Sequence, residues 1–138
     1  MNTKIWMTLS SLLLALAGGV ALFAPEVLLA LFGGEATATG LEVLVQLMGG
    51  LYFAMAMMNW TAKDSAIGGI YARPVSLANL AHFFIGSLLL LRPVLSAALQ
   101  GPLLGLFLIY TIFAVYFAWL VFVATGLPKG STMGGHQT

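Results

Sequence analysis

The sequence lacks cysteine and is poor in charge. Without cysteine the chain has no disulfide, thiolate nucleophile, cysteine-bound iron–sulfur cluster or cysteine-ligated zinc site. Charged residues make up 7% of the 138 residues, far below the roughly 25% of soluble domains. The few basic residues are scattered and the net charge is +1, so the pattern excludes a nucleic-acid-binding protein.

Hydrophobic residues are abundant, at 61% of the chain. They gather in four long apolar stretches, each near the roughly 20 residues that a helix needs to cross a bilayer. We therefore predict an all-α integral membrane protein, a four-helix bundle in contact with the lipid bilayer. It forms a single membrane domain over residues 1–138, with spans at about 5–24, 41–61, 74–91 and 102–125.

Helix-end signals support these spans and predict one extra element. The stretch from Pro25 to Phe32 opens with proline and is followed by Gly33, but it is too short to cross. It predicts a short interfacial helix between spans 1 and 2. Thr39 and Glu42 have the spacing of a capping box before span 2.

Spans 3 and 4 each start with a proline that suits a first helical turn, Pro74 and Pro102. Span 3 is expected to end at Leu91, before an arginine and a proline. Span 4 is expected to run to Thr125, where a following glycine and proline stop the helix.

Basic residues predict the orientation. Lys4, Lys63, Arg73 and Lys129 fall on one side and only Arg92 on the other, which places both termini in the cytoplasm of a bacterial inner membrane. A cleaved signal peptide is the alternative for the first stretch and would leave three spans. The uncleaved chain satisfies the charge rule at every loop.

Polar residues in the spans suggest a site. Asn79 and His82 are three residues apart, so they share a helix face with Ser76 and Gly86. His82 lies about 12 Å into the membrane, near its midplane. Further hydroxyls fall at similar depths on the other spans, and some of them are expected to hydrogen-bond Asn79 and His82: Ser10, Ser11, Tyr52 and Tyr116.

Two interpretations of this polar cluster stay open. Hydrogen bonds between helices hold membrane bundles together, so the cluster has a purely structural explanation. Alternatively it forms a small binding or proton-handling site, in which a neutral His82 accepts a proton.

A second group of residues lies at the predicted cytoplasmic mouth: Asn59, Trp60, Lys63 and Arg73. A glycine pair in the loop and the start of span 3 nearby suit an anionic headgroup, phosphate or carboxylate. The same basic residues are also what the charge rule requires at this side.

Pairs of small residues at four-residue spacing predict close helix contacts, within the chain or between copies. These pairs are Ala15 with Gly19, Gly50 with Ala54, and Ala114 with Ala118. The methionines of span 2 indicate flexible packing in place of copper binding. Span 4 is aromatic around most of its circumference, a surface for lipid, a partner or a hydrophobic cofactor.

Several membrane functions are disfavoured by the same residues. A haem between helices usually needs two axial ligands, and His82 is the only histidine in a span. A cation exporter is expected to carry a carboxylate within a span, and here the acidic residues lie at ends or in loops. Arg73, Asn79 and His82 resemble the motif of glutathione-using four-helix membrane enzymes, a remote alternative, since the glutamate that follows in those enzymes is missing.

The run NWTAKDSAIGGIYARPVSLANLAHF, from Asn59 to Phe83, resembles small uncharacterised four-helix bacterial membrane proteins of the DoxX-like group. The likeness extends from Pro25 to about Pro93. It implies the fold and a bacterial inner membrane, and it attaches no function to any residue.

These patterns favour a non-enzymatic membrane component: an accessory or scaffold protein, or one that binds a small ligand. No catalytic residue, cofactor or metal ligand is predicted, while small-residue seams favour a homo-oligomer or a larger membrane complex. The alternative is a small transporter or carrier that uses the region of Asn79 and His82.

Overall fold

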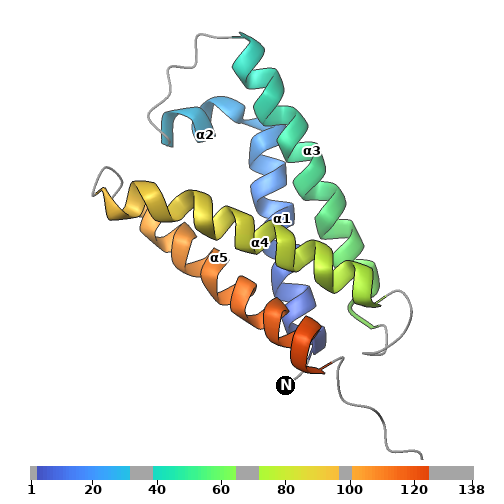
Figure 1. The fold of residues 1–138 in the computed structure, drawn as a ribbon. Coiled ribbons are helices and arrows are strands. Elements are labelled where there is room, and N and C mark those ends of the chain that lie inside the picture. Colours follow the sequence, from blue (N-terminus) through green and yellow to red (C-terminus); the bar gives the residue numbers. More distant parts are fainter. Residues whose placement is uncertain (1–2, 32–38, 65–71, 97–100, 125–138) are drawn as a thin grey trace, which may run out of the picture. The chain divides into compact units, whose positions relative to one another are not determined.

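The computed structural model describes residues 3–31, 39–64, 72–96 and 101–124, and the elements found there are helices. The chain divides into two compact units, Met1–Ala66 (unit 1) and Ile67–Thr138 (unit 2). Each unit contains a hairpin of two long helices and one short additional element (Figure 1).

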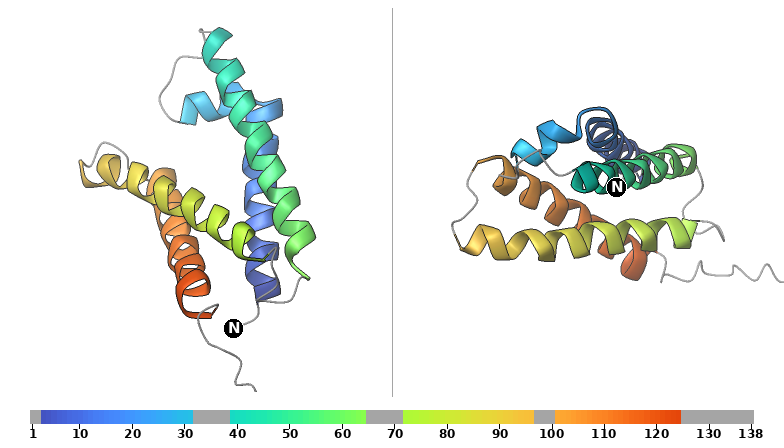
Figure 2. Two further views of the ribbon diagram at one scale, coloured as in Figure 1. Left: turned by 45° about the vertical axis from the view of Figure 1, so that its right-hand side comes forward. Right: turned by 90° about the horizontal axis from the view of Figure 1, so that it is seen from above.

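Unit 1 contains α1 (Thr3–Phe23), α2 (Pro25–Leu31) and α3 (Thr39–Ala62). Proline has no N–H and clashes with the preceding turn, so Pro25 ends α1 and starts α2 in a new direction. The α1 and α3 helices lie side by side in every view (Figure 2), and α2 contacts both. This short helix matches the element predicted at Pro25–Phe32.

The contact between α1 and α3 is a seam of small residues. The buried positions of α1 recur every three or four residues and therefore form one stripe: Met7, Ser10, Ser11, Leu14, Gly18 and Ala21. At its centre the two backbones approach so closely that a Cβ on Gly18 would lie 2.8 Å from the carbonyl oxygen of Gly49. A Cβ on Gly49 would in turn lie 2.9 Å from the backbone nitrogen of Leu22.

The predicted seam residues are neighbours of the observed ones. At both Gly19 and Gly50 a Cβ would meet no atom within 4 Å, so neither glycine makes the close contact inside unit 1. Successive helical residues are about 100° apart around the axis, so a shift of one residue moves the contact to a different face.

Unit 2 contains α4 (Ala72–Leu95), α5 (Pro102–Trp119) and η1 (Leu120–Ala124), a π-helical turn that continues α5. Gly101 precedes α5 with a φ of +82°, a conformation that glycine adopts without strain. The α4 and α5 helices pack along each other (Figures 1 and 2). The π-helical turn in span 4 was not predicted from the sequence.

The core of unit 2 is aromatic. Phe83 of α4 is fully buried and stacks on Phe113 and Phe117 of α5, with ring centroids 4.8 and 5.8 Å apart. Tyr110 meets the edge of the Phe83 ring at 5.2 Å. In a bilayer such packing has to hold the helices together, because lipid tails are as apolar as the side chains.

The end of α4 differs from the prediction. The helix does not stop at Leu91 but continues through Arg92 and Pro93 to Leu95. A proline near the last turn removes only one hydrogen bond, and Ser96 closes the turn with a backbone bond to the carbonyl of Arg92 at 3.1 Å.

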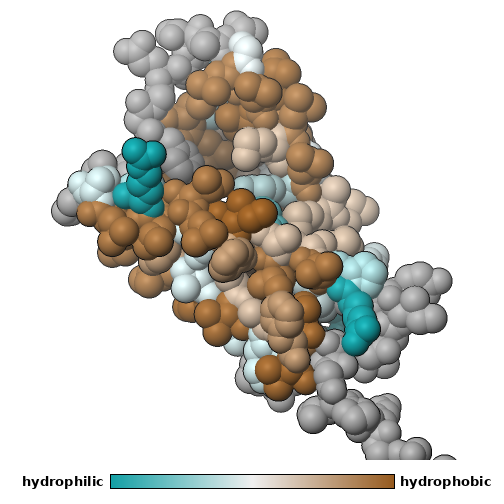
Figure 3. Space-filling model, viewed as in Figure 1, coloured by the Kyte–Doolittle hydropathy of each residue, from teal (hydrophilic) through white to brown (hydrophobic). Residues whose placement is uncertain are grey.

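Four of the helices are long and apolar enough to cross a membrane, so the predicted fold class is confirmed. Large hydrophobic side chains cover most of the described surface on the face shown in Figure 3. Surface of this kind fits contact with lipid. The single membrane domain stays a prediction, and so do the limits within which each helix lies in the membrane.

Candidate functional site

A buried group of polar side chains joins α1 to α3 in unit 1. The Asn59 side chain is fully buried, and its Nδ2 donates to the Ser10 hydroxyl at 3.0 Å. The Ser10 hydroxyl donates to the carbonyl of Met7 at 3.0 Å, and the Ser11 hydroxyl donates to the carbonyl of Ala56 at 2.7 Å. Since an unsatisfied polar group in a bilayer costs several kcal/mol, these bonds favour the paired hairpin.

This arrangement was not predicted from the sequence. The sequence predicts Asn59 at a cytoplasmic mouth, which stays a prediction, and in unit 1 its amide nitrogen bonds Ser10. One signal for this contact was present in the sequence. Ser10 lies three residues after Met7, and this spacing puts it on the same stripe of α1, the one that faces α3. The third predicted hydroxyl of unit 1, Tyr52, lies beside the glycine seam, with its Cβ 3.2 Å from the Cβ position of Gly18.

Charged residues meet where α1 begins and α3 ends. Lys4 Nζ lies 2.7 Å from Asp64 Oδ1, with both side chains 60% exposed. The hydrogen bond from Lys4, with the positive charges of Lys4 and Lys63, holds the pKa of the Asp64 carboxyl below its usual range. Lys63 Nζ lies 2.9 Å from the ring centroid of Trp60, a cation–π contact.

In unit 2, Asn79 and His82 have different surroundings. Asn79 is fully buried, and its Nδ2 donates to the carbonyl of Val75 at 2.8 Å, one turn earlier in α4. His82 is half-buried, and its Nε2 lies 3.3 Å from the hydroxyl of Tyr110. The two rings are 5.5 Å apart, and Phe83 meets the imidazole edge at 5.1 Å.

Tyr110 is therefore a neighbour of His82 that the prediction did not include. Tyr116, the predicted partner, packs against the rings of Phe117 and Trp119, with centroids 5.2 and 6.3 Å away. The sequence held one signal for Tyr110, because Gly86 lies one turn after His82 and leaves a gap on the same face of α4. A second polar pair joins these helices, with Ser87 Oγ 2.7 Å from Thr111 Oγ1.

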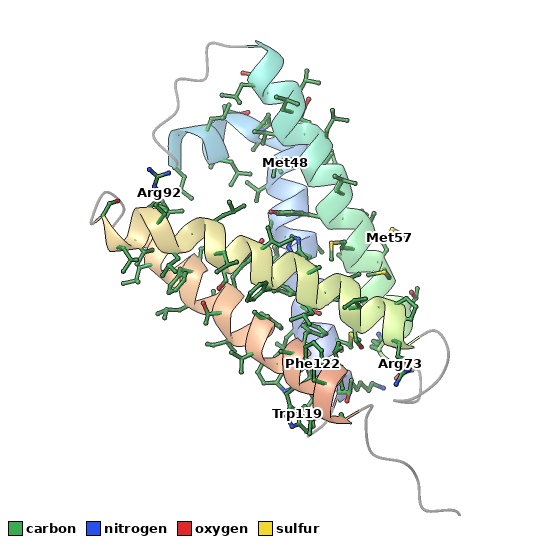
Figure 4. The ribbon with its side chains drawn as sticks, viewed as in Figure 1. Met48, Met57, Arg73, Arg92, Trp119 and Phe122 are labelled. Atoms are coloured by element: carbon green, nitrogen blue, oxygen red, sulfur yellow. The ribbon has the colours of Figure 1, made fainter. Side chains whose placement is uncertain are left out.

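The residues predicted for the cytoplasmic mouth belong to both units. Asn59, Trp60 and Lys63 lie near the end of α3, and Arg73 is exposed in the first turn of α4. Figure 4 shows Arg73 and Arg92 at opposite ends of α4. The loop at 68–71 lies outside the described residues. A common site for an anionic group stays a prediction.

The hydrogen bonds expected from Ser10, Ser11 and Tyr52 to Asn79 and His82 would join the two units, and they also stay predictions. Within unit 1 the structure brings Ser10 together with Asn59, and within unit 2 it brings His82 together with Tyr110. Across the described residues, no three histidine, cysteine or acidic side chains gather as a metal site would require.

Comparison with protein-family models, curated proteins and solved structures finds no match. The chain is thus a small polytopic membrane protein for which no family is identified.

Proposed function

We propose that this chain is a non-enzymatic membrane component, an accessory or scaffold protein that associates with copies of itself or with a larger complex. The observation that carries the proposal is that polar side chains of the spans form hydrogen bonds between the helices of each hairpin. Ser11 bonds a carbonyl of the facing helix, Asn59 bonds Ser10, and Ser87 meets Thr111. Each of these contacts joins two helices of one hairpin, which is the structural use of polarity in membranes.

Small residues on an exposed face are consistent with a partner. The seam of unit 1 uses Gly18 and Gly49, which leaves Gly50 exposed on α3 with open space around it. Ala54 is exposed one turn later. Small residues at this spacing let helices approach closely, so a helix of another protein chain is favoured here over lipid alone.

The proposal is tested by purification from native membranes in a mild detergent, followed by native mass spectrometry. A stoichiometric complex, of this chain with itself or with another subunit, is expected. Photo-crosslinking residues placed at Leu51 and Leu89, exposed by 68% and 71%, are expected to trap that partner from one unit or the other. The same residue at Leu14, exposed by 1%, is the control. A monomer that yields no protein crosslink from either unit would contradict the proposal.

A second candidate function is a small carrier of an apolar or weakly anionic molecule. It would use the region of Asn79 and His82. The half-buried imidazole of His82 beside the Tyr110 hydroxyl favours it, because an ionisable group within a span is commonly functional. His82→Gln is expected to keep the fold and to abolish binding of any small molecule that co-purifies with the wild-type chain. Unchanged binding would discard this candidate.

We further propose that both termini lie in the cytoplasm of a bacterial inner membrane. The ion pair of Lys4 with Asp64 puts Lys4 and Lys63 at the same end of unit 1, which supports this orientation. Because the chain has no cysteine, single cysteines report topology directly. In intact cells an impermeant maleimide is expected to label Gln100→Cys but not Thr138→Cys or Asn2→Cys. The opposite labelling would reverse the topology, and loss of the Asn2 cysteine from the mature chain would indicate cleavage.

A further inference from the structure

The ring of Tyr110 occupies the space that α4 leaves open at Gly86. A Cβ at Gly86 would overlap Cδ1 and Cε1 of this ring. Glycine within a helix is less favourable than alanine. The contact therefore gives Gly86 a packing role that alanine would not fill without moving the tyrosine.

The position of the ring decides what its hydroxyl reaches. Gly86 and His82 are four residues apart, so they lie one above the other on the same face of α4. With its ring against Gly86, Tyr110 of α5 extends to His82, where its oxygen lies 3.3 Å from Nε2. The Phe83 ring packs against both, with centroids 5.1 Å from His82 and 5.2 Å from Tyr110.

We propose that the polar site of the α4/α5 hairpin is the pair of His82 and Tyr110, with Gly86 as its positioning residue. A hydrogen bond at one imidazole nitrogen fixes the ring orientation and decides which nitrogen carries the proton. Tyr110 supplies that bond only while position 86 has no side chain. The functional meaning of this pair rests on the second candidate function, whereas its geometry is measured without any ligand.

The test uses the two nitrogen resonances of the His82 imidazole, recorded by ¹⁵N NMR on the full chain in lipid nanodiscs. The chain has two histidines, so the His82→Gln variant assigns the signals. Gly86→Ala is expected to shift the Nε2 resonance because the displaced tyrosine no longer reaches it. Tyr110→Phe, which keeps the ring and removes the hydroxyl, is expected to shift the same resonance.

Two matched controls distinguish positioning from general disturbance. Gly105→Ala changes a glycine of the same hairpin whose Cβ position meets no atom within 4 Å, and it is expected to leave the His82 signals unchanged. Tyr116→Phe removes the other phenol of α5 and is also expected to leave them unchanged. In the Tyr110→Phe background, Gly86→Ala is expected to add no further shift of Nε2.

An unshifted Nε2 resonance in Tyr110→Phe would overturn the proposed hydrogen bond between His82 and Tyr110. This outcome holds even if Gly86→Ala does not fold. An equal shift in Gly86→Ala with and without the Tyr110 hydroxyl would overturn the positioning role. Failure of the carrier function can be distinguished from failure of the His82 and Tyr110 pair. If only the carrier function fails, His82→Gln binds the co-purifying molecule with the same affinity as the wild type, while the resonance shifts occur as expected.

Discussion

Units 1 and 2 are both hairpins of membrane-length helices, yet their helices are joined by different contacts. Unit 1 brings two backbones together at Gly18 and Gly49 and adds hydrogen bonds from serine and asparagine. Unit 2 fills its interface with the stacked rings of Phe83, Phe113 and Phe117.

The difference illustrates two solutions to one problem. Because lipid removes the hydrophobic advantage of helix association, the helices have to gain by dispersion and hydrogen bonding. Small residues increase the dispersion attraction by letting the two backbones approach closely. Aromatic rings increase it by the large area of their contacts. We therefore expect unit 1 to be sensitive to added atoms and unit 2 to removed atoms.

The largest effect is expected from Gly49→Leu in unit 1. Its Cβ would already lie 2.9 Å from backbone atoms of α1, which cannot move aside as a side chain would. We expect a loss of about 3 kcal/mol in the free energy of unfolding, the upper end of the range typical of overpacking. Reversible unfolding in mixed detergent micelles measures it. Gly50→Leu, one residue further on the open face, is the control, and equal losses in both variants would refute the seam.

Phe83→Ala is the corresponding test of unit 2. In soluble proteins this change costs about 3–5 kcal/mol, part of which is transfer from water. That part is absent in lipid, so we expect about 2 kcal/mol from the lost ring contacts. The neighbouring Phe84→Ala, which removes a ring exposed by 52%, serves as the control in the same unfolding experiment. A loss at Phe84 as large as at Phe83 would mean that the aromatic stack does not stabilise the hairpin.

A smaller effect tests whether the polar contacts of the two units are equivalent. Double-mutant cycles on Asn59 with Ser10, and on Ser87 with Thr111, measure the coupling energy of each pair. We expect about 0.6 kcal/mol in each, the average for such bonds in membranes. A coupling near zero in one unit alone would show that its hydrogen bond contributes nothing to stability.

The smallest effect concerns the exposed pair of Lys4 and Asp64 at the end of unit 1. The Asp64 pKa is lower in the folded protein than in the unfolded chain, so the pair stabilises the fold above the usual carboxyl pKa of about 3.9. This contribution is lost as the pH falls through the lowered pKa. On acidification Asp64→Asn is expected to lose slightly less free energy of unfolding than the wild type. Lys4→Met is expected to show the same smaller loss. High salt should weaken the difference, and a pH profile identical to that of the wild type would show that the pair is not formed.

Local chemistry was enough to predict the fold class. A run of apolar residues long enough to cross a bilayer has few alternatives to a helix, because its backbone groups need partners that lipid cannot supply. Pro25 marks the break between α1 and α2 for a similarly local reason. The same rule failed at Pro93, where the last turn of α4 tolerates the missing bond.

The sequence by itself thus determined that this chain forms four membrane-length helices and a short helix. Only the tertiary structure decided which face of each helix is used: Gly49 in preference to Gly50, Tyr110 beside His82, and Asn59 inside its hairpin. The physical reason is that these helices are apolar almost all round, so no polar face indicates their rotation. Their rotation and register follow from how the side chains of two helices fit together, and that fit cannot be read from one helix at a time.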